Sequence, residues 1–260
     1  MQFVQVNGVS LHHQIIGGPG SKPVIVFINS LGTDFRIWLP LFDELGDDVS
    51  VLFYDSRGHG ESDKPAGPYS LTRLGQDALC VLGALGIKKA HFCGISMGGL
   101  TGLWLAVYAP ERFLKIVVAN TAAKIGTKEG WQSRAAAVRE QGLAELATSA
   151  PQRWFTPGFI RKHAALVEQL TDTLAEQDKE GYAACCDALA EADLRADLSR
   201  IQLPLLVIAG SADPVTTVAD AEAIVQACPS ASLVSLKASH ISNLEQPAAF
   251  NRALSQFLRA

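Results

Sequence analysis

The clearest chemical signal in the chain is a serine flanked by glycines. Ser96 lies in Gly94-Ile95-Ser96-Met97-Gly98, which matches G-x-S-x-G between a short apolar run and a helix-like stretch. A sharp turn from strand to helix would crowd side chains two residues before and after the serine, and glycines remove that collision. The pattern predicts a serine nucleophile at a helix N-terminus, where the helix dipole favours developing negative charge. The alternative is a glycine-rich turn with an incidental serine.

A serine hydroxyl is a weak nucleophile until a base takes its proton. His240 follows the apolar run 232–236, and Asp213 follows the run 205–209, so the chain order is serine, acid, histidine. We predict that His240 accepts the proton of Ser96 and that Asp213 orients the imidazole. A surface-loop histidine and a helix N-cap are the respective alternatives.

Other candidates for these roles fit less well. Asp193 and Asp197 are the fallback acids. The remaining histidines lie in a predicted hairpin, in an early loop, before the serine turn and in the middle of the chain: His12, His13, His59, His91 and His163.

A tetrahedral intermediate needs two N–H donors to bind its oxyanion. We expect one from Met97, directly after the nucleophile, and the other from Leu31, in the loop after the run 24–28. A residue next to Leu31 is the alternative. A second glycine-containing segment, 55–62, is interpreted as a structural loop held by hydrogen bonds of Asp55 and Arg57.

These residues need a scaffold, and the first 120 residues alternate strand-like and helix-like segments. Apolar runs without polar alternation are typical of strands that are covered on both faces, as in a parallel sheet. The strand-like runs are 24–28, 49–54, 90–93 and 116–120, and the helix-like stretches are 71–85 and 98–108. Asn7-Gly8, between two alternating runs, predicts a hairpin at the start of the chain.

The middle of the chain differs, because residues 123–196 hold no strand-like run. Strands then return at 205–209 and 232–236, with helices expected at 218–227 and 246–258. The sequence predicts an α/β fold with a mostly parallel, doubly wound sheet, in which a core of residues 1–122 and 197–260 is interrupted by a helical lid, 123–196. Because carboxyl ends of parallel strands share one edge, Ser96, Asp213 and His240 should meet there.

Composition excludes several classes of protein. The chain has 260 residues, 48% hydrophobic and 18% charged, which is typical of a globular protein. A net charge of −4 without a Lys/Arg run gives no reason to expect nucleic acid as a partner. Five cysteines at unpatterned spacings, no signal peptide and no membrane-length apolar run predict a cytoplasmic protein with free thiols. Neither metal nor cofactor motifs occur.

Several motifs together resemble the α/β-hydrolase superfamily: N-S-L-G (29–32), D-x-R-G-x-G-x-S (55–62), G-x-S-M-G-G (94–99), S-A-D-P-V (211–215) and H-I-S-N-L-E (240–245). Segments 120–126, 130–134 and 153–156 are more closely similar to β-ketoadipate enol-lactone hydrolases. The resemblance implies the α/β-hydrolase fold with a lid and a reaction without a cofactor, in which a small carboxylate-bearing lactone is opened through an acyl-enzyme. The oligomeric state stays open.

The same resemblance implies residues that bind the substrate. Arg134 would pair the substrate carboxylate, because a guanidinium can do so with two hydrogen bonds. Trp131 and Trp154 would form an apolar wall. The alternatives are a solvated helix residue for Arg134 and simple packing of the insertion for the two tryptophans.

Competing functions use the same scaffold. A carboxylesterase or a C–C bond hydrolase would need the same three residues, and a ligand receptor could retain the hydrolase fold. Dehalogenases and epoxide hydrolases are disfavoured, because their chemistry uses a carboxylate where this chain has Ser96.

Overall fold

A computed structural model describes residues 2–17, 22–41 and 49–260 of the protein. In these ranges eight strands form one sheet in the order β1-β2-β4-β3-β5-β6-β7-β8. The strands are β1 (Gln2–Val6), β2 (Val9–Ile16), β3 (Val24–Ile28), β4 (Ser50–Tyr54), β5 (Ala90–Ile95), β6 (Phe113–Ala119), β7 (Leu205–Gly210) and β8 (Ala231–Leu236). β2 pairs antiparallel with β1 and with β4, whereas the neighbouring strands from β4 to β8 pair in parallel. The predicted mostly parallel α/β sheet is confirmed.

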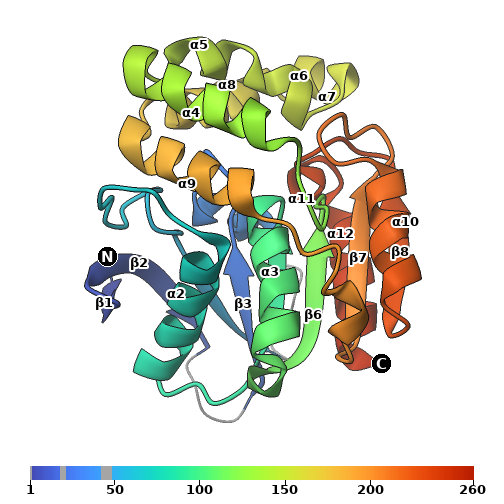
Figure 1. Cartoon of the computed structure of the whole chain (residues 1–260). Helices are drawn as coiled ribbons and strands as arrows, with labels where there is room; N and C mark the ends of the chain where they lie inside the picture. Colours follow the sequence, from blue (N-terminus) through green and yellow to red (C-terminus); the bar gives the residue numbers. More distant parts are fainter. Residues whose placement is uncertain (1, 18–21, 42–48) are drawn as a thin grey trace.

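Helices cover both faces of this sheet (Figure 1). α2 (Leu71–Ala84), α3 (Met97–Tyr108) and α10 (Val218–Ala227) lie in front, and α12 (Pro247–Arg259) lies behind. Every residue of β3, β4, β5 and β7 is buried, which explains the uninterrupted apolar runs in the sequence. Shorter helical turns are η1 (Phe35–Trp38), η2 (Pro110–Arg112), η3 (Leu198–Arg200) and α11 (Ser242–Glu245).

The expected hairpin joins β1 to β2 through Asn7 and Gly8. Both residues have positive φ angles, 50° and 77°, as a tight two-residue turn requires. The hairpin extends the sheet at the edge next to β4.

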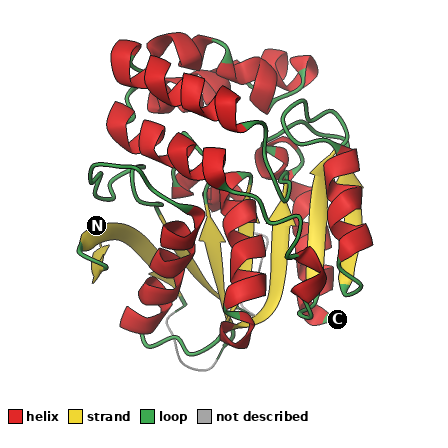
Figure 2. Ribbon diagram, in the orientation of Figure 1, coloured by secondary structure: helices red, strands yellow, loops and turns green. Residues whose placement is uncertain are grey.

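Six helices and no strand occupy residues 123–196, all of which the structure describes. They are α4 (Lys128–Gln141), α5 (Ala144–Thr148), α6 (Ala150–Trp154), α7 (Pro157–Lys162), α8 (Ala164–Ala175) and α9 (Lys179–Glu191). Figures 1 and 2 show them as a layer over the carboxyl ends of the strands. The exact boundaries of this insertion, 123 and 196, remain a prediction.

The insertion contacts the core through a close approach of two backbones. α9 begins after its N-cap, Asp178, whose side chain accepts from the N–H of Gly181. A Cβ atom on Gly181 would lie 2.6 Å from the Cα of Gly58 in the loop after β4. Glycine at both positions therefore lets α9 rest directly on that loop.

Candidate active site

Ser96 stands at a sharp turn between β5 and α3. Its φ angle is 56°, in the left-handed region that residues other than glycine rarely adopt. A Cβ on Gly94 would lie 2.3 Å from the carbonyl oxygen of Gly98, and a Cβ on Gly98 would lie 2.5 Å from that of Ile28. The glycines thus permit the turn and bring it against the carboxyl end of β3.

Three residues from distant parts of the chain form one line of hydrogen bonds. His240 Nδ1 lies 2.8 Å from Asp213 Oδ2, and His240 Nε2 lies 2.9 Å from Ser96 Oγ. Because a carboxylate only accepts, Nδ1 carries the proton, and Nε2 is left to accept from the hydroxyl of Ser96. All three side chains are buried, and the arrangement can transfer a proton from Ser96 to His240.

Asp213 sits in a dense set of donors. Besides His240, Asn120 Nδ2 and Thr216 Oγ1 donate to Oδ2 at 3.0 and 2.9 Å. The backbone N–H groups of Val215 and Thr216 donate to Oδ1 at 2.8 and 3.1 Å. Burial disfavours the charge of Asp213, but bonds from His240, Asn120 and Val215 outweigh it and hold its pKa below the ordinary value.

The alternatives for the acid lie elsewhere. Helix α10 is capped by Thr217, so Asp213 is not its N-cap. Asp193 pairs with Arg195 at 2.6 Å, and Asp197 pairs with Arg200 at 2.8 Å, both at the surface. Neither fallback acid is hydrogen-bonded to His240 in the described part of the chain.

Leu31 lies in a loop held by neighbouring side chains. Asn29 Nδ2 donates to the carbonyl oxygens of Ser30 and Thr33 at 3.0 and 2.6 Å, and Asn29 Oδ1 accepts from the Ser56 hydroxyl at 2.9 Å. Within the described ranges the N–H of Leu31 has no acceptor. Met97 is the first residue of α3, so its N–H has no partner inside the helix.

His59 also holds this loop, a role that the sequence interpretation did not assign. The N–H of Gly32 donates to His59 Nε2 at 2.8 Å, so that nitrogen carries no proton. Burial lowers the pKa of His59 to about 4. A neutral His59 is therefore an acceptor that fixes the backbone next to Leu31. Its position in a glycine-containing loop signalled only a tight turn.

Asp55 and Arg57 of segment 55–62 have structural partners, as expected. Asp55 Oδ1 accepts from the N–H of Phe35 at 2.8 Å, and Asp55 Oδ2 accepts from that of Glu61 at 3.1 Å. Arg57 forms a buried ion pair with Asp77 of α2. These bonds tie the loop to both η1 and the front helix layer.

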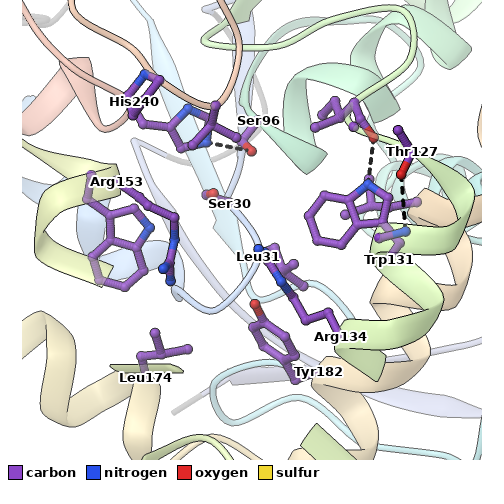
Figure 3. A pocket seen from close by; sticks show the side chains of 17 residues that line it. Ser30, Leu31, Ser96, Thr127, Trp131, Arg134, Arg153, Leu174, Tyr182 and His240 are labelled. Atoms are coloured by element: carbon purple, nitrogen blue, oxygen red, sulfur yellow. Dashed lines mark hydrogen bonds between the residues drawn. The ribbon is translucent and has the colours of Figure 1, made fainter. Parts of the chain in front are cut away.

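Ser96 opens into a cavity of about 300 Å³ between the core and the insertion (Figure 3). The core contributes Ser30, Leu31 and His240 to its lining. From the insertion come the three predicted binding residues together with others: Trp131, Arg134, Arg153, Trp154, Leu174, Tyr182 and Leu189. The structure therefore brings Trp131, Arg134 and Trp154 to the cavity that contains Ser96.

Arg134 and Trp131 support each other on α4. Trp131 Nε1 donates to the carbonyl oxygen of Ile125 at 2.5 Å, which fixes the indole. The guanidinium of Arg134 lies 4.8 Å from the centre of that ring, within cation–π range. Tyr182 of α9 lines the same cavity as Arg134, and burial raises the pKa of its hydroxyl. Tyr182 was missed because it stands in an alanine-rich stretch without a motif.

No group of three or more His, Cys, Asp or Glu side chains is placed to hold a metal ion among the described residues. In the same ranges, every helix is too short or too polar to cross a membrane.

Comparison with known proteins adds to this geometry. A family profile described as the α/β-hydrolase fold matches residues 23–247. The chain belongs to the α/β-hydrolase family. This α/β hydrolase is 52% identical to 3-oxoadipate enol-lactonase 2 of Acinetobacter baylyi, over 93% of its own length and 91% of the relative's. It is 49% identical to 3-oxoadipate enol-lactonase 1 of the same organism, over 94% and 92% of the two chains.

A solved structure agrees with these relatives. The enol-lactonase from Burkholderia xenovorans covers 100% of both chains, with 42% identity and a TM-score of 0.97. The resemblance inferred from the sequence motifs is thereby confirmed for the superfamily and for the enol-lactonases within it.

Proposed function

We propose that this α/β hydrolase is a serine-dependent 3-oxoadipate enol-lactonase, which opens the enol-lactone of β-ketoadipate in the breakdown of aromatic compounds. The observation that carries the proposal is its 52% identity, over 93% of its length, to a 3-oxoadipate enol-lactonase. The hydrogen-bonded line Ser96–His240–Asp213, opening into a small cavity, supports the chemistry.

In the first half-reaction, Ser96 Oγ attacks the lactone carbonyl carbon while its proton moves to His240 Nε2. The N–H groups of Leu31 and Met97 bind the oxyanion of the tetrahedral intermediate. Its collapse breaks the ring C–O bond, and His240 returns the proton to the leaving enol oxygen. The enol becomes a ketone, which makes this departure easy, and the acyl chain stays on Ser96.

In the second half-reaction, water replaces the enol. His240 takes a proton from the water, whose oxygen attacks the acyl carbon, and the proton then returns to Ser96 as the ester bond breaks. The product is the open-chain dicarboxylate. Asp213 stabilises the imidazolium in both halves and keeps the proton of the neutral ring on Nδ1.

The cavity walls select the substrate. Arg134 pairs the free carboxylate of the lactone, and Trp131 and Trp154 pack against its apolar part. Helices of residues 123–196 act as a lid that keeps bulk water from the acyl-enzyme.

The compartment and the partners of the protein belong to the same proposal. The protein acts on a small-molecule lactone in the cytoplasm, with neither nucleic acid nor a membrane as partner. Its net charge of −4 and its free cysteines support this setting.

Replacement of the nucleophile tests the proposal. We expect Ser96→Ala to lower kcat for the enol-lactone by at least about 10³-fold with little change in thermal unfolding, because only the attacking oxygen is lost. The control is Ser70→Ala, which removes an exposed cap of α2 and should leave kcat unchanged. Near-normal turnover by Ser96→Ala would exclude the mechanism. Failure of the wild-type enzyme to open the enol-lactone, while it cleaves neutral esters, would exclude the substrate.

A further inference from the structure

A second arginine faces the cavity and has no role in the function proposed so far. Arg153 belongs to α6, whereas Arg134 belongs to α4, and both line the cavity that contains Ser96. Figure 3 shows the two side chains reaching into the cavity from opposite sides. Among the described residues, no carboxylate oxygen lies within 4.0 Å of either guanidinium.

Two guanidinium groups without a carboxylate partner make the cavity electrostatically unfavourable unless a negative charge lies between them. Arg153 is partly buried, and burial together with the positive charge of Arg134 lowers its pKa. Two like charges that share an apolar, partly dehydrated space repel each other, and an anion between them reverses the sign of that interaction. The pair is therefore matched to a ligand that supplies the missing negative charge.

The Arg153 guanidinium donates hydrogen bonds to two neutral oxygens of the insertion. Nη1 donates to Ser149 Oγ at 2.7 Å, and Nη2 donates to the carbonyl oxygen of Leu146 at 3.3 Å. A guanidinium has five N–H donors, so donors remain for the cavity side. Arg134 is held in turn by the ring of Trp131, whose centre lies 4.8 Å from its guanidinium. Both cations are thus positioned before a ligand arrives, which lowers the entropy cost of binding.

We propose that Arg134 and Arg153 form a two-guanidinium clamp for one carboxylate of a small substrate, and that Arg153 determines specificity for the anionic form. The proposal rests on the proposed function where it concerns the lactone. The chemistry of the clamp itself applies to short carboxylic and dicarboxylic acids that fit a cavity of about 300 Å³.

The first test compares matched substrates. We expect Arg153→Gln to raise KM for the lactone acid by about 10- to 100-fold, the loss of one charge-assisted hydrogen-bond pair, and to change KM for the methyl ester less than about threefold. Arg153→Lys should recover only part of the affinity, because an ammonium lacks the planar fork.

The control is Arg161→Gln, which removes the same charge from an exposed position on α7 and should leave both KM values unchanged. An equal effect of Arg153→Gln on the acid and the ester would make Arg153 a structural residue that only joins α5 to α6, and would overturn the clamp. Thermal unfolding of each variant separates loss of fold from loss of binding.

The second test does not depend on the reaction. Calorimetric binding of adipate and of neutral dimethyl adipate is measured on Ser96→Ala with Arg134→Gln, Arg153→Gln or both. The clamp predicts at least about tenfold weaker adipate binding in each single variant and a double variant little worse than either. Additive losses would indicate two separate anion sites, and unchanged adipate binding would indicate none. Either result overturns the clamp. Failure of the wild-type enzyme to open the lactone, with Arg153-dependent adipate binding intact, would overturn only the proposed substrate.

Discussion

At the scale of single residues, the hydrogen-bond partners around Asp213 fit a carboxylate and do not fit the amide of an asparagine. Both carboxylate oxygens accept hydrogen bonds, from His240 and Asn120 on one side and from backbone N–H groups of Val215 and Thr216 on the other. An asparagine would direct its NH₂ group at one of these donors in either orientation. It would also leave the proton of His240 free to move to Nε2, where it blocks acceptance from Ser96.

We therefore expect Asp213→Asn to lower kcat by about 10⁴-fold, because the imidazole then adopts the wrong tautomer. The free energy of unfolding should also fall by about 1–3 kcal/mol, since a buried donor faces a donor. Steady-state kinetics and urea denaturation measure the two effects. Asp197→Asn, which alters a surface ion pair, is the control. If turnover survived in Asp213→Asn, another residue would be the acid.

At the scale of elements, a close backbone contact between α9 and the loop after β4 fixes the position of this helix relative to the core. Gly58 and Gly181 approach so closely that neither can carry a side chain without backbone movement. α9 supplies Tyr182, which follows Gly181 directly and lines the cavity. A shift of this helix would therefore change the shape of the cavity that contains Ser96.

Two glycine-to-alanine variants test this contact. In a helix, alanine is ordinarily more stable than glycine by about 1 kcal/mol. Gly83→Ala in α2, where a Cβ meets nothing within 4 Å, should show that gain. Gly181→Ala should instead lose about 1–3 kcal/mol and raise KM, because the new Cβ overpacks the interface. Chemical denaturation and kinetics measure both variants, and stabilisation by Gly181→Ala would argue against tight docking of α9.

At the scale of the whole molecule, buried histidines make folding sensitive to acid. Burial lowers the pKa values of His59 and His91 to about 4, from about 6.5 in an unfolded chain. Between these values the unfolded chain binds protons that the folded protein does not. The free energy of unfolding therefore falls as pH drops from 6.5 to about 4, and is unaffected by these groups above 6.5.

The expected loss is up to about 3 kcal/mol for each histidine across this range. His91→Phe removes one of these groups away from the cavity, so it should flatten the pH dependence of unfolding without changing activity. Ser70→Ala, which alters no titratable group, is the control and should leave the slope unchanged. Urea denaturation at several pH values between 4 and 7 measures the effect. Equal slopes for wild type and His91→Phe would show that His91 does not contribute.

Much of this organisation could be predicted from local patterns. Apolar runs predicted β3, β4 and β7 to within about one residue, because strands buried on both faces tolerate no polar side chain. The serine turn was recognisable because only glycine fits at 94 and 98. The order of the strands could not be predicted in this way. β3 pairs with β4 and with β5, but the local sequence of residues 24–28 does not indicate which strands will be its neighbours.

By itself, the sequence determined which segments become strands and helices, where the serine turn lies and in what order serine, acid and histidine follow, because these depend on short-range sterics and periodicity. Only the tertiary structure decided that Arg153 and Tyr182 join Arg134 in the cavity and that His59 supports the loop of Leu31. Those groups come from separate helices and loops. The packing between elements, which no local pattern encodes, determines which side chains of each element face the cavity.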